Sequence, residues 1–138
     1  MNYLLDTNVL SEMSKLQYNQ NVKTFIESLP LEDFYISVIT IGEMCYGVER
    51  LPVSRKKHEL SILVYKKIPE MFKNRIITID TELSLEWGRM KARTKRTLSI
   101  ADSLIAATTL LHNLILVTQN TKDFEGIEGI NLLNPWEF

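Results

Sequence analysis

The sequence is poor in the residues that build disulfide frameworks and zinc centres. It has one cysteine, Cys45, and only two histidines, His58 and His112, which lie far apart in the chain. A single cysteine excludes a disulfide scaffold, and so few soft ligands argue against a His/Cys zinc centre. No apolar run approaches the roughly 18–20 residues that span a bilayer, and the N-terminus lacks the basic start of a signal peptide. We therefore expect no membrane association and a cytoplasmic location, where a lone thiol stays reduced.

The sequence also lacks an excess of charge of either sign. Sixteen Lys and Arg residues stand against 17 Asp and Glu residues, which gives a net charge of −1. This balance excludes a strongly basic nucleic-acid binder but leaves room for a local basic patch. Hydrophobic residues make up 45% of the chain, as in ordinary globular proteins. Because 138 residues fit one core, we expect residues 1–138 to form a single domain.

Short apolar runs alternate with amphipathic segments along the chain. Apolar and β-branched composition predicts strands at residues 3–5, 34–38, 75–79, 114–118 and 131–133. Helical spacing predicts helices at residues 9–13, 19–29, 40–50, 55–72, 81–97 and 99–112. Pro69 is expected to interrupt the fourth of these helices. The alternation predicts an α/β fold, a three-layer sandwich with a mainly parallel central sheet, in which ligands bind beyond the carboxyl ends of the strands.

Four carboxylates fall close to these strand ends or in the first turns of predicted helices: Asp6, Glu43, Asp102 and Asp123. One interpretation is structural. The spacings Thr40 to Glu43 and Ser99 to Asp102 fit capping boxes, and Asp6 fits an N-cap. The other interpretation is a shared site at one edge of the sheet.

Burial favours the shared site. The helix at 99–112 is so apolar that it must be largely buried, and Asp6 directly follows a buried strand. Several carboxylates that converge in a reduced dielectric repel one another unless a cation is bound. Oxygen ligands without histidine suit Mg²⁺ or Mn²⁺, and such sites commonly serve phosphodiester chemistry. Capping and metal binding are compatible, because a helix N-terminus helps to keep an acid ionised.

Four blocks of sequence, in order along the chain, resemble a known family. They are Leu4–Leu10, Ile39–Glu43 with Tyr46-Gly47, Ala101-Asp102 with Leu104–Thr108, and Leu116–Asn120 with Asp123-Phe124. Together they resemble the PIN-domain ribonucleases and, more narrowly, the VapC-type toxins of bacterial type II toxin–antitoxin systems. The ending Asn134-Pro135-Trp136 is similar to the FitB-like subgroup.

The resemblance implies a metal-dependent endoribonuclease, a hydrolase in which a metal-activated water attacks an RNA phosphate. It implies Asp6, Glu43 and Asp102 as catalytic and metal-binding residues, with Mg²⁺ or Mn²⁺ as cofactor. Either Asp123, through water, or Asn120 is expected to complete the metal site, because Asn120 stands where some members carry an acid. The site-supporting residues implied in this way are Thr7, Asn8, Thr118 and Asn120.

The resemblance also implies partners: an RNA substrate, a small cognate antitoxin and a second copy of the chain. DNA would be reached only through the antitoxin. Met44 and Trp136 mark candidate dimer faces, and we expect Trp136 to serve packing or dimerisation rather than base stacking. The basic run that ends at Arg96 includes three candidate RNA-binding residues: Arg89, Lys91 and Arg93. A solvated helix end is the alternative for this run.

Two other functions remain open at this point. A haloacid-dehalogenase type of phosphatase also places an aspartate after its first strand, but the second aspartate expected two residues later is replaced here by Asn8. A PIN-like module with weak or no nuclease activity, which pairs with a DNA-binding antitoxin to regulate transcription, is the alternative to an active toxin.

Overall fold

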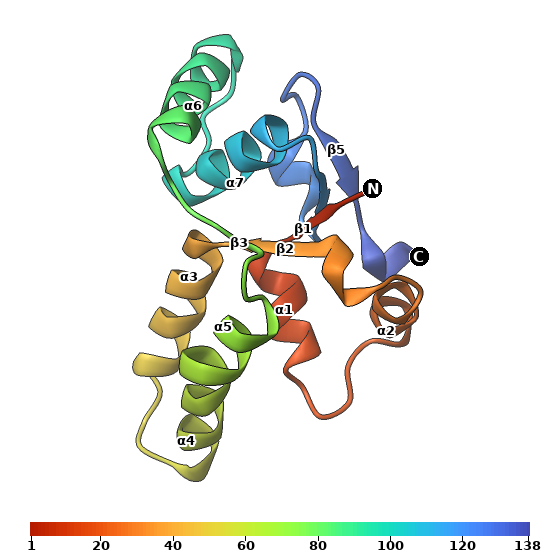
Figure 1. The fold of residues 1–138 in the computed structure, drawn as a ribbon, viewed down its shortest axis with the longest axis vertical. Helices are drawn as coiled ribbons and strands as arrows, with labels where there is room; N and C mark the ends of the chain where they lie inside the picture. The colour runs from red at the N-terminus through yellow and green to blue at the C-terminus, as the bar shows by residue number, and fades with distance from the viewer.

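Five short parallel strands form the centre of the structure (Figure 1), a computed structural model that describes residues 1–138. The strands are β1 (Tyr3–Leu5), β2 (Phe34–Ser37), β3 (Ile76–Ile77), β4 (Ile115–Val117) and β5 (Asn131–Leu133). They pair in the order β3-β2-β1-β4-β5, and every pair is parallel. β1 therefore lies in the middle, and residues that follow it emerge at the centre of the carboxyl edge.

Helices cover both faces of the sheet. They are α1 (Thr7–Met13), α2 (Gln20–Glu27), α3 (Val38–Glu49), α4 (Arg55–Ile62), α5 (Ile68–Met71), α6 (Thr81–Arg93) and α7 (Ile100–Leu111). Short 3₁₀ turns occupy Leu31–Asp33, Thr121–Phe124 and Pro135–Glu137. In Figure 1, α6 and α7 lie on one side of the strands and α1 to α5 on the other. None of the helices has the length and apolar character needed to cross a bilayer.

Alternate strand residues pack into two separate hydrophobic cores, one on each face of the sheet, which confirms the predicted three-layer α/β sandwich. Leu5 and Val117 pack with α1, α2, α3 and α5 in one cluster. Leu4 and Leu116, one residue earlier in each strand, pack with α6 and α7 in the other. This period of two is the pleat of a strand that is buried on both faces. The rigid layers on either side hold the carboxyl edge of the sheet in place.

The start of α3 differs from the prediction. Ser37 is its N-cap, with its hydroxyl accepting a hydrogen bond from Ile39 N at 3.0 Å, so the helix begins at Val38. Thr40 is fully buried inside the first turn, and its hydroxyl oxygen has no partner. The capping box from Thr40 to Glu43 is therefore wrong, and Glu43 lies in the second turn of α3. The sequence offered two hydroxyl residues three positions apart, and the one that ends β2 became the cap.

The predicted helix at 55–72 is continuous but not uniform. Between α4 and α5 the backbone widens into a π-helical turn at Leu63–Lys67. Pro69 follows in the first turn of α5, where a missing N–H is tolerated. The expected interruption near Pro69 thus takes the form of a widened turn. Several other elements are shorter than predicted, most clearly β3, which is confined to Ile76–Ile77, and α6, which ends at Arg93.

Candidate active site

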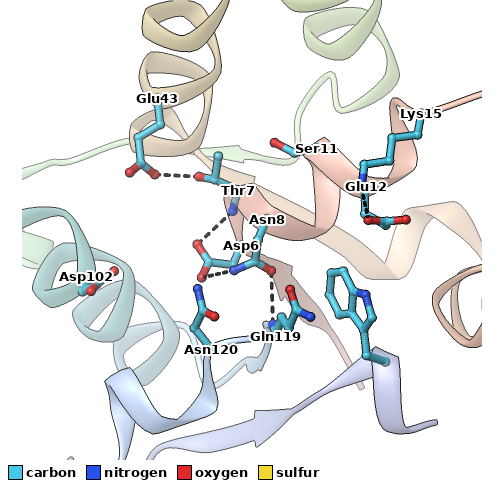
Figure 2. Close-up of a pocket in the computed structure, with 11 residues that line it drawn as sticks. Asp6, Thr7, Asn8, Ser11, Glu12, Lys15, Glu43, Asp102, Gln119 and Asn120 are labelled. Carbon is cyan, nitrogen blue, oxygen red and sulfur yellow. Dashed lines mark hydrogen bonds and ion pairs between the residues drawn. The ribbon is translucent and has the colours of Figure 1, made fainter. Parts of the chain in front are cut away.

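A pocket of about 470 Å³ opens at the carboxyl edge of the sheet (Figure 2). Residues from α1, α3, α7 and the segment after β4 line it together with one residue near the C-terminus. The lining residues are Asp6, Thr7, Asn8, Ser11, Glu12, Lys15, Glu43, Asp102, Gln119, Asn120 and Trp136. Three of the four acids singled out in the sequence thus face one pocket.

Asp6 is the most deeply placed of these acids. It follows β1 directly, is only 8% exposed, and forms the N-cap of α1 by accepting a hydrogen bond from Thr7 N at 2.8 Å. Its other oxygen, Oδ2, accepts from Thr118 Oγ1 at 2.9 Å and from Asn8 Nδ2 at 3.3 Å. Asp6 is therefore both a helix cap and a lining residue of the pocket, as the two interpretations of the sequence allowed together.

Burial raises the pKa of Asp6 above its ordinary value of 3.8. The hydrogen bonds from Thr118 and Thr7 oppose this shift, because they stabilise the carboxylate. The negative charges of Asp102 and Glu43 add to the rise. The three carboxylates are thus close enough to repel one another in the folded chain.

Glu43 reaches the pocket from α3. Its Oε1 accepts a hydrogen bond of 2.6 Å from the hydroxyl of Thr7, which belongs to α1 (Figure 2). Thr7 therefore contacts two acids at once, Asp6 through its backbone and Glu43 through its side chain. This links the first turn of α1 to the second turn of α3. The side chain of Glu43 is otherwise exposed to solvent.

Asp102 approaches the pocket from α7, whereas Glu43 comes from α3 (Figure 2). Ser99 caps this helix by accepting from Asp102 N at 3.1 Å, so half of the predicted capping box is present. Burial raises the pKa of Asp102, and the charges of Asp123 and Glu43 raise it further. The Ser99 side chain and the Arg96 guanidinium act in the opposite direction.

Asn8 and Thr118 support Asp6 from the neighbouring elements. Asn8 Nδ2 donates to Thr118 Oγ1 at 3.1 Å, and Asn8 Oδ1 accepts from Gln119 N at 3.1 Å. Thr118 Oγ1 also accepts from Asn120 N at 3.1 Å, while its own proton goes to Asp6. The end of β4 is thereby joined to the end of β1 around one carboxylate.

Asn120 and Asp123 lie at different distances from the pocket. Asn120 lines it, whereas Asp123 does not, although its charge acts on Asp102. Asp123 is exposed in the 3₁₀ turn Thr121–Phe124, which no side chain caps. Arg96 holds this turn in place by donating to Lys122 O at 2.8 Å and to Glu125 O at 3.2 Å. The sequence reasoning left Arg96 out of the site, although it stands at the end of the basic run.

None of the residues of the basic run lines the pocket. Arg89 and Arg93 both pair with Glu86 on α6, at 3.7 and 3.8 Å, and Lys91 Nζ lies 4.8 Å from the ring centre of Trp87. These three side chains are exposed and interact within their own helix. Their role in RNA binding stays a prediction.

Four further residues, which were not predicted from the sequence, line the pocket: Ser11, Glu12, Lys15 and Gln119. Spacing identifies the first three in retrospect, because residues 7, 8, 11, 12 and 15 recur at intervals of three and four on one face around α1. Lys15 is the one cation that lines the pocket, and its Nζ lies 2.9 Å from Glu12 Oε1. That contact and a hydrogen bond from Asn19 N hold the pKa of Glu12 below its usual range. Trp136 packs against the core, as predicted, and also lines the same pocket.

The carboxylates share the pocket without forming a closed cage. No three Asp, Glu, His or Cys side chains come close enough to one another to enclose a metal ion directly. The pocket is nevertheless lined by carboxylate, amide and hydroxyl oxygens, with no soft ligand. A hard cation that keeps part of its water shell matches such a set of donors.

Comparison with known families confirms the resemblance in the sequence. Residues 3–129 match the model of the PIN domain. The chain belongs to the PIN-domain family.

Two relatives and one solved structure are similar to nearly the whole chain. Toxin FitB of Neisseria gonorrhoeae is 35% identical and is covered over 97% of its length, with 96% of this chain aligned. The VapC ribonuclease Y4jK of Sinorhizobium fredii is 28% identical, with 97% of each chain covered. In the structure of FitAB bound to an IR36 DNA fragment, the matching chain is 33% identical with a TM-score of 0.90, covering 99% of this chain and 96% of that one.

The raised pKa of Asp102 predicts how its neutralisation affects stability. An acid whose pKa is higher in the folded chain costs stability once it ionises, so the cost is present at neutral pH and fades as the pH falls toward 3.8. Asp102→Asn should therefore melt at a higher temperature than the parent at pH 7 in EDTA. Solvent screening at this half-buried site limits the gain to about 1 kcal/mol, or roughly 2–5 °C.

Differential scanning calorimetry at pH 7 and at pH 4 measures both effects. Asp33→Asn, in the turn that precedes β2 at the opposite edge of the sheet, is the matched control and should melt like the parent. A lower melting temperature for Asp102→Asn at pH 7 would mean that Asp102 acts only as a helix-terminal acid.

Proposed function

We propose that the chain is a Mg²⁺- or Mn²⁺-dependent endoribonuclease and the toxin of a toxin–antitoxin pair. The observation that carries the proposal is the set of mutually repelling carboxylates, Asp6, Glu43 and Asp102, around one pocket. Folding against this repulsion is explained if a cation binds there in the working protein. The similarity to Toxin FitB and to a VapC ribonuclease supports the same assignment.

The residues present fit a hydrated divalent cation. Asp6 would be the fixed ligand, because three hydrogen bonds set the direction of its carboxylate. Glu43 would bind from α3 and Asp102 from α7, with Asp123 acting through water. Their separation suits Mg²⁺, which retains several waters and needs few protein ligands. The bound cation would polarise a phosphoryl oxygen and make a water more acidic.

Side chains of the protein would then position the carboxylates and accept the proton of the attacking water. Thr118 and Thr7 donate to Asp6 and help to keep it ionised against the effect of burial. Thr7 also fixes the direction of Glu43. Asp102 lines the pocket with a half-exposed side chain, so it is suited to accept a proton from the attacking water. Single-stranded or loop RNA is the expected substrate, because its backbone and bases are accessible.

Removal of the central charge should abolish cleavage. We expect Asp6→Asn to lower the rate of RNA cleavage in Mg²⁺ by more than about 100-fold, since even residues behind metal ligands contribute 10- to 100-fold. The new amide would also place an N–H against the donors Asn8 and Thr118. Gel analysis of a labelled, unstructured RNA, with and without EDTA, measures the effect.

Asp33→Asn purified in parallel controls for contaminating nuclease. Equal cleavage by Asp6→Asn and the parent would exclude the proposed mechanism. Absence of cleavage by the parent in either metal would favour the alternative, a PIN-like module that pairs with a DNA-binding antitoxin to regulate transcription.

A long groove beside the site is suited to the antitoxin. It has a volume of about 850 Å³ and runs between α1, α3, α4 and the π-helical turn. Seven of its 16 lining residues are hydrophobic, and it meets the active-site pocket at Thr7, Ser11, Lys15 and Glu43. A partner helix or strand that fills this groove would bring a basic side chain to the carboxylates. In a related structure, FitAB is bound to a DNA fragment, which fits DNA contact through the antitoxin.

Expression without the antitoxin should therefore stop growth. We expect induction of the parent chain in bacteria to arrest colony formation, and Asp6→Asn produced at the same level to be tolerated. Colony counts and immunoblots measure growth and protein level. Normal growth with parent protein that cleaves RNA in the matching extract would contradict the toxin assignment.

We also propose a homodimer, with a corrected interface. Met44 is buried and lines the groove, so it does not present a dimer face. The exposed apolar residues Tyr46 and Ile100 instead flank a hollow of about 550 Å³ between α3 and α7. Exposed apolar surface of this kind is typical of an interface between protein chains.

The double variant Tyr46→Ser/Ile100→Ser should be monomeric where the parent is dimeric. Light scattering at micromolar concentration gives both masses. Leu85→Ser on α6, also an exposed apolar residue, is the control and should leave the dimer intact. A monomeric parent would exclude the dimer.

A further inference from the structure

The side chains of the active-site pocket fall into two groups. Around the carboxylates, the polar side-chain atoms of Thr7, Asn8 and Thr118 form hydrogen bonds within the chain. Gln119 and Asn120 are held by their backbone N–H groups instead, so their side-chain amides stay free and exposed in the pocket. Figure 2 shows both amides rising from the segment after β4. The side chains around the carboxylates thus have their hydrogen-bond partners within the chain, whereas Gln119 and Asn120 present free donors and acceptors to the pocket.

Trp136 brings an aromatic ring to the part that is not satisfied. The residue is half-buried, packs against the core on the α1–α3 side of the sheet, and also lines the pocket. Asn134 Oδ1 accepts from Trp136 N at 2.9 Å, and Asn21 Nδ2 donates to Trp136 O at 2.7 Å. The indole N–H makes no hydrogen bond within the chain. The backbone of Trp136 is thus held on both sides, and its half-exposed ring lies at the pocket, where it can stack on a base.

The side chain of Asn134 links the residue that carries the ring to one of the residues that carry a free amide. Asn134 Nδ2 donates to Gln119 O at 3.4 Å, so one side chain bonds both the residue that carries the ring and the residue that carries an amide. Lys15, the one cation of the pocket, is on the same lining, where its Nζ also pairs with Glu12 Oε1 at 2.9 Å. An aromatic face, amides for a base edge and a cation for a phosphate are the groups that recognise a single-stranded nucleotide.

We propose that Trp136, with Gln119 and Asn120, forms a nucleobase subsite that selects which nucleotide of single-stranded RNA lies next to the carboxylates. Trp136 stacks on the base, and the two amides contact its hydrogen-bonding edge. The inference rests on the proposed function, because it places the subsite in the same pocket. It assigns base preference to the segment after β4 and to the C-terminal turn, rather than to the basic run of α6.

Fluorescence tests the stacking directly. Trp87 lies on α6 outside the pocket, and Trp87→Phe leaves Trp136 as the single tryptophan. A single-stranded RNA hexamer in Ca²⁺ buffer, checked by gel to remain intact, should quench this emission with saturation. An abasic hexamer with the same number of phosphates should quench at least about 5-fold more weakly at equal concentration. Equal quenching by both oligomers, or none by either, would overturn the proposal.

Kinetics provides the second measurement. Trp136→Leu should raise the KM for RNA cleavage about 5- to 100-fold, the range expected for loss of one stacked base, with a smaller change in kcat. Trp136→Phe, which keeps a ring, should retain most of the affinity. Gln119→Ala, at an exposed position, should change the distribution of cleavage sites without loss of folding. Thermal unfolding of each variant checks that the core is intact.

The outcomes separate the subsite from the function itself. RNA cleavage with unchanged KM and unchanged cleavage sites in Trp136→Leu and Gln119→Ala would refute the subsite and leave the nuclease in place. Base-dependent quenching by a chain that cleaves no RNA in any metal would support the subsite and refute the nuclease.

Discussion

The arrangement of the site depends on one buried carboxylate at the end of the central strand. Asp6 ends β1, caps α1 and accepts the Thr118 hydroxyl from the neighbouring strand. The same few atoms therefore set where α1 begins, how β1 and β4 end relative to each other, and where the pocket lies. Because a buried acid is stable only when its oxygens are satisfied, these three features cannot vary independently.

The buried, mutually repelling carboxylates of the site lower the stability of the folded chain. Asp6 and Asp102 both have raised pKa values: the charge of Asp102 adds to the rise at Asp6, and the charge of Glu43 adds to the rise at both. Well-packed layers on either side of the sheet hold this repulsion in place. Such local strain is typical of functional sites, where binding of a ligand recovers the energy that folding lost.

Local patterns predicted the layers, the parallel sheet and the acids, because each depends on residues close in sequence. Asp6 follows an apolar strand, and Ser99 and Asp102 open an apolar helix, so their positions could be foreseen. The start of α3 could not, since Ser37 and Thr40 both fit a cap and only the end of β2 decides between them. Nor could the place of Trp136, which depends on bonds from Asn21, 115 positions earlier in the chain. The pairing of Arg89 with Glu86 was visible as helical spacing, whereas the contact of Arg93 with Glu86, seven positions away, was not.

The central position of β1 has a consequence for synthesis on the ribosome. β1 is made first, yet it pairs with β4, and Leu5 lies opposite Val117. Until residues 115–118 emerge, the Asp6 carboxylate lacks its Thr118 donor and the strand lacks one neighbour. Asp6 and Glu43 are synthesised early. The pocket is completed only near the end of translation, because the pairing of β1 with β4 requires residues that are far apart in the sequence. The topology thus delays completion of the pocket until most of the chain has been made.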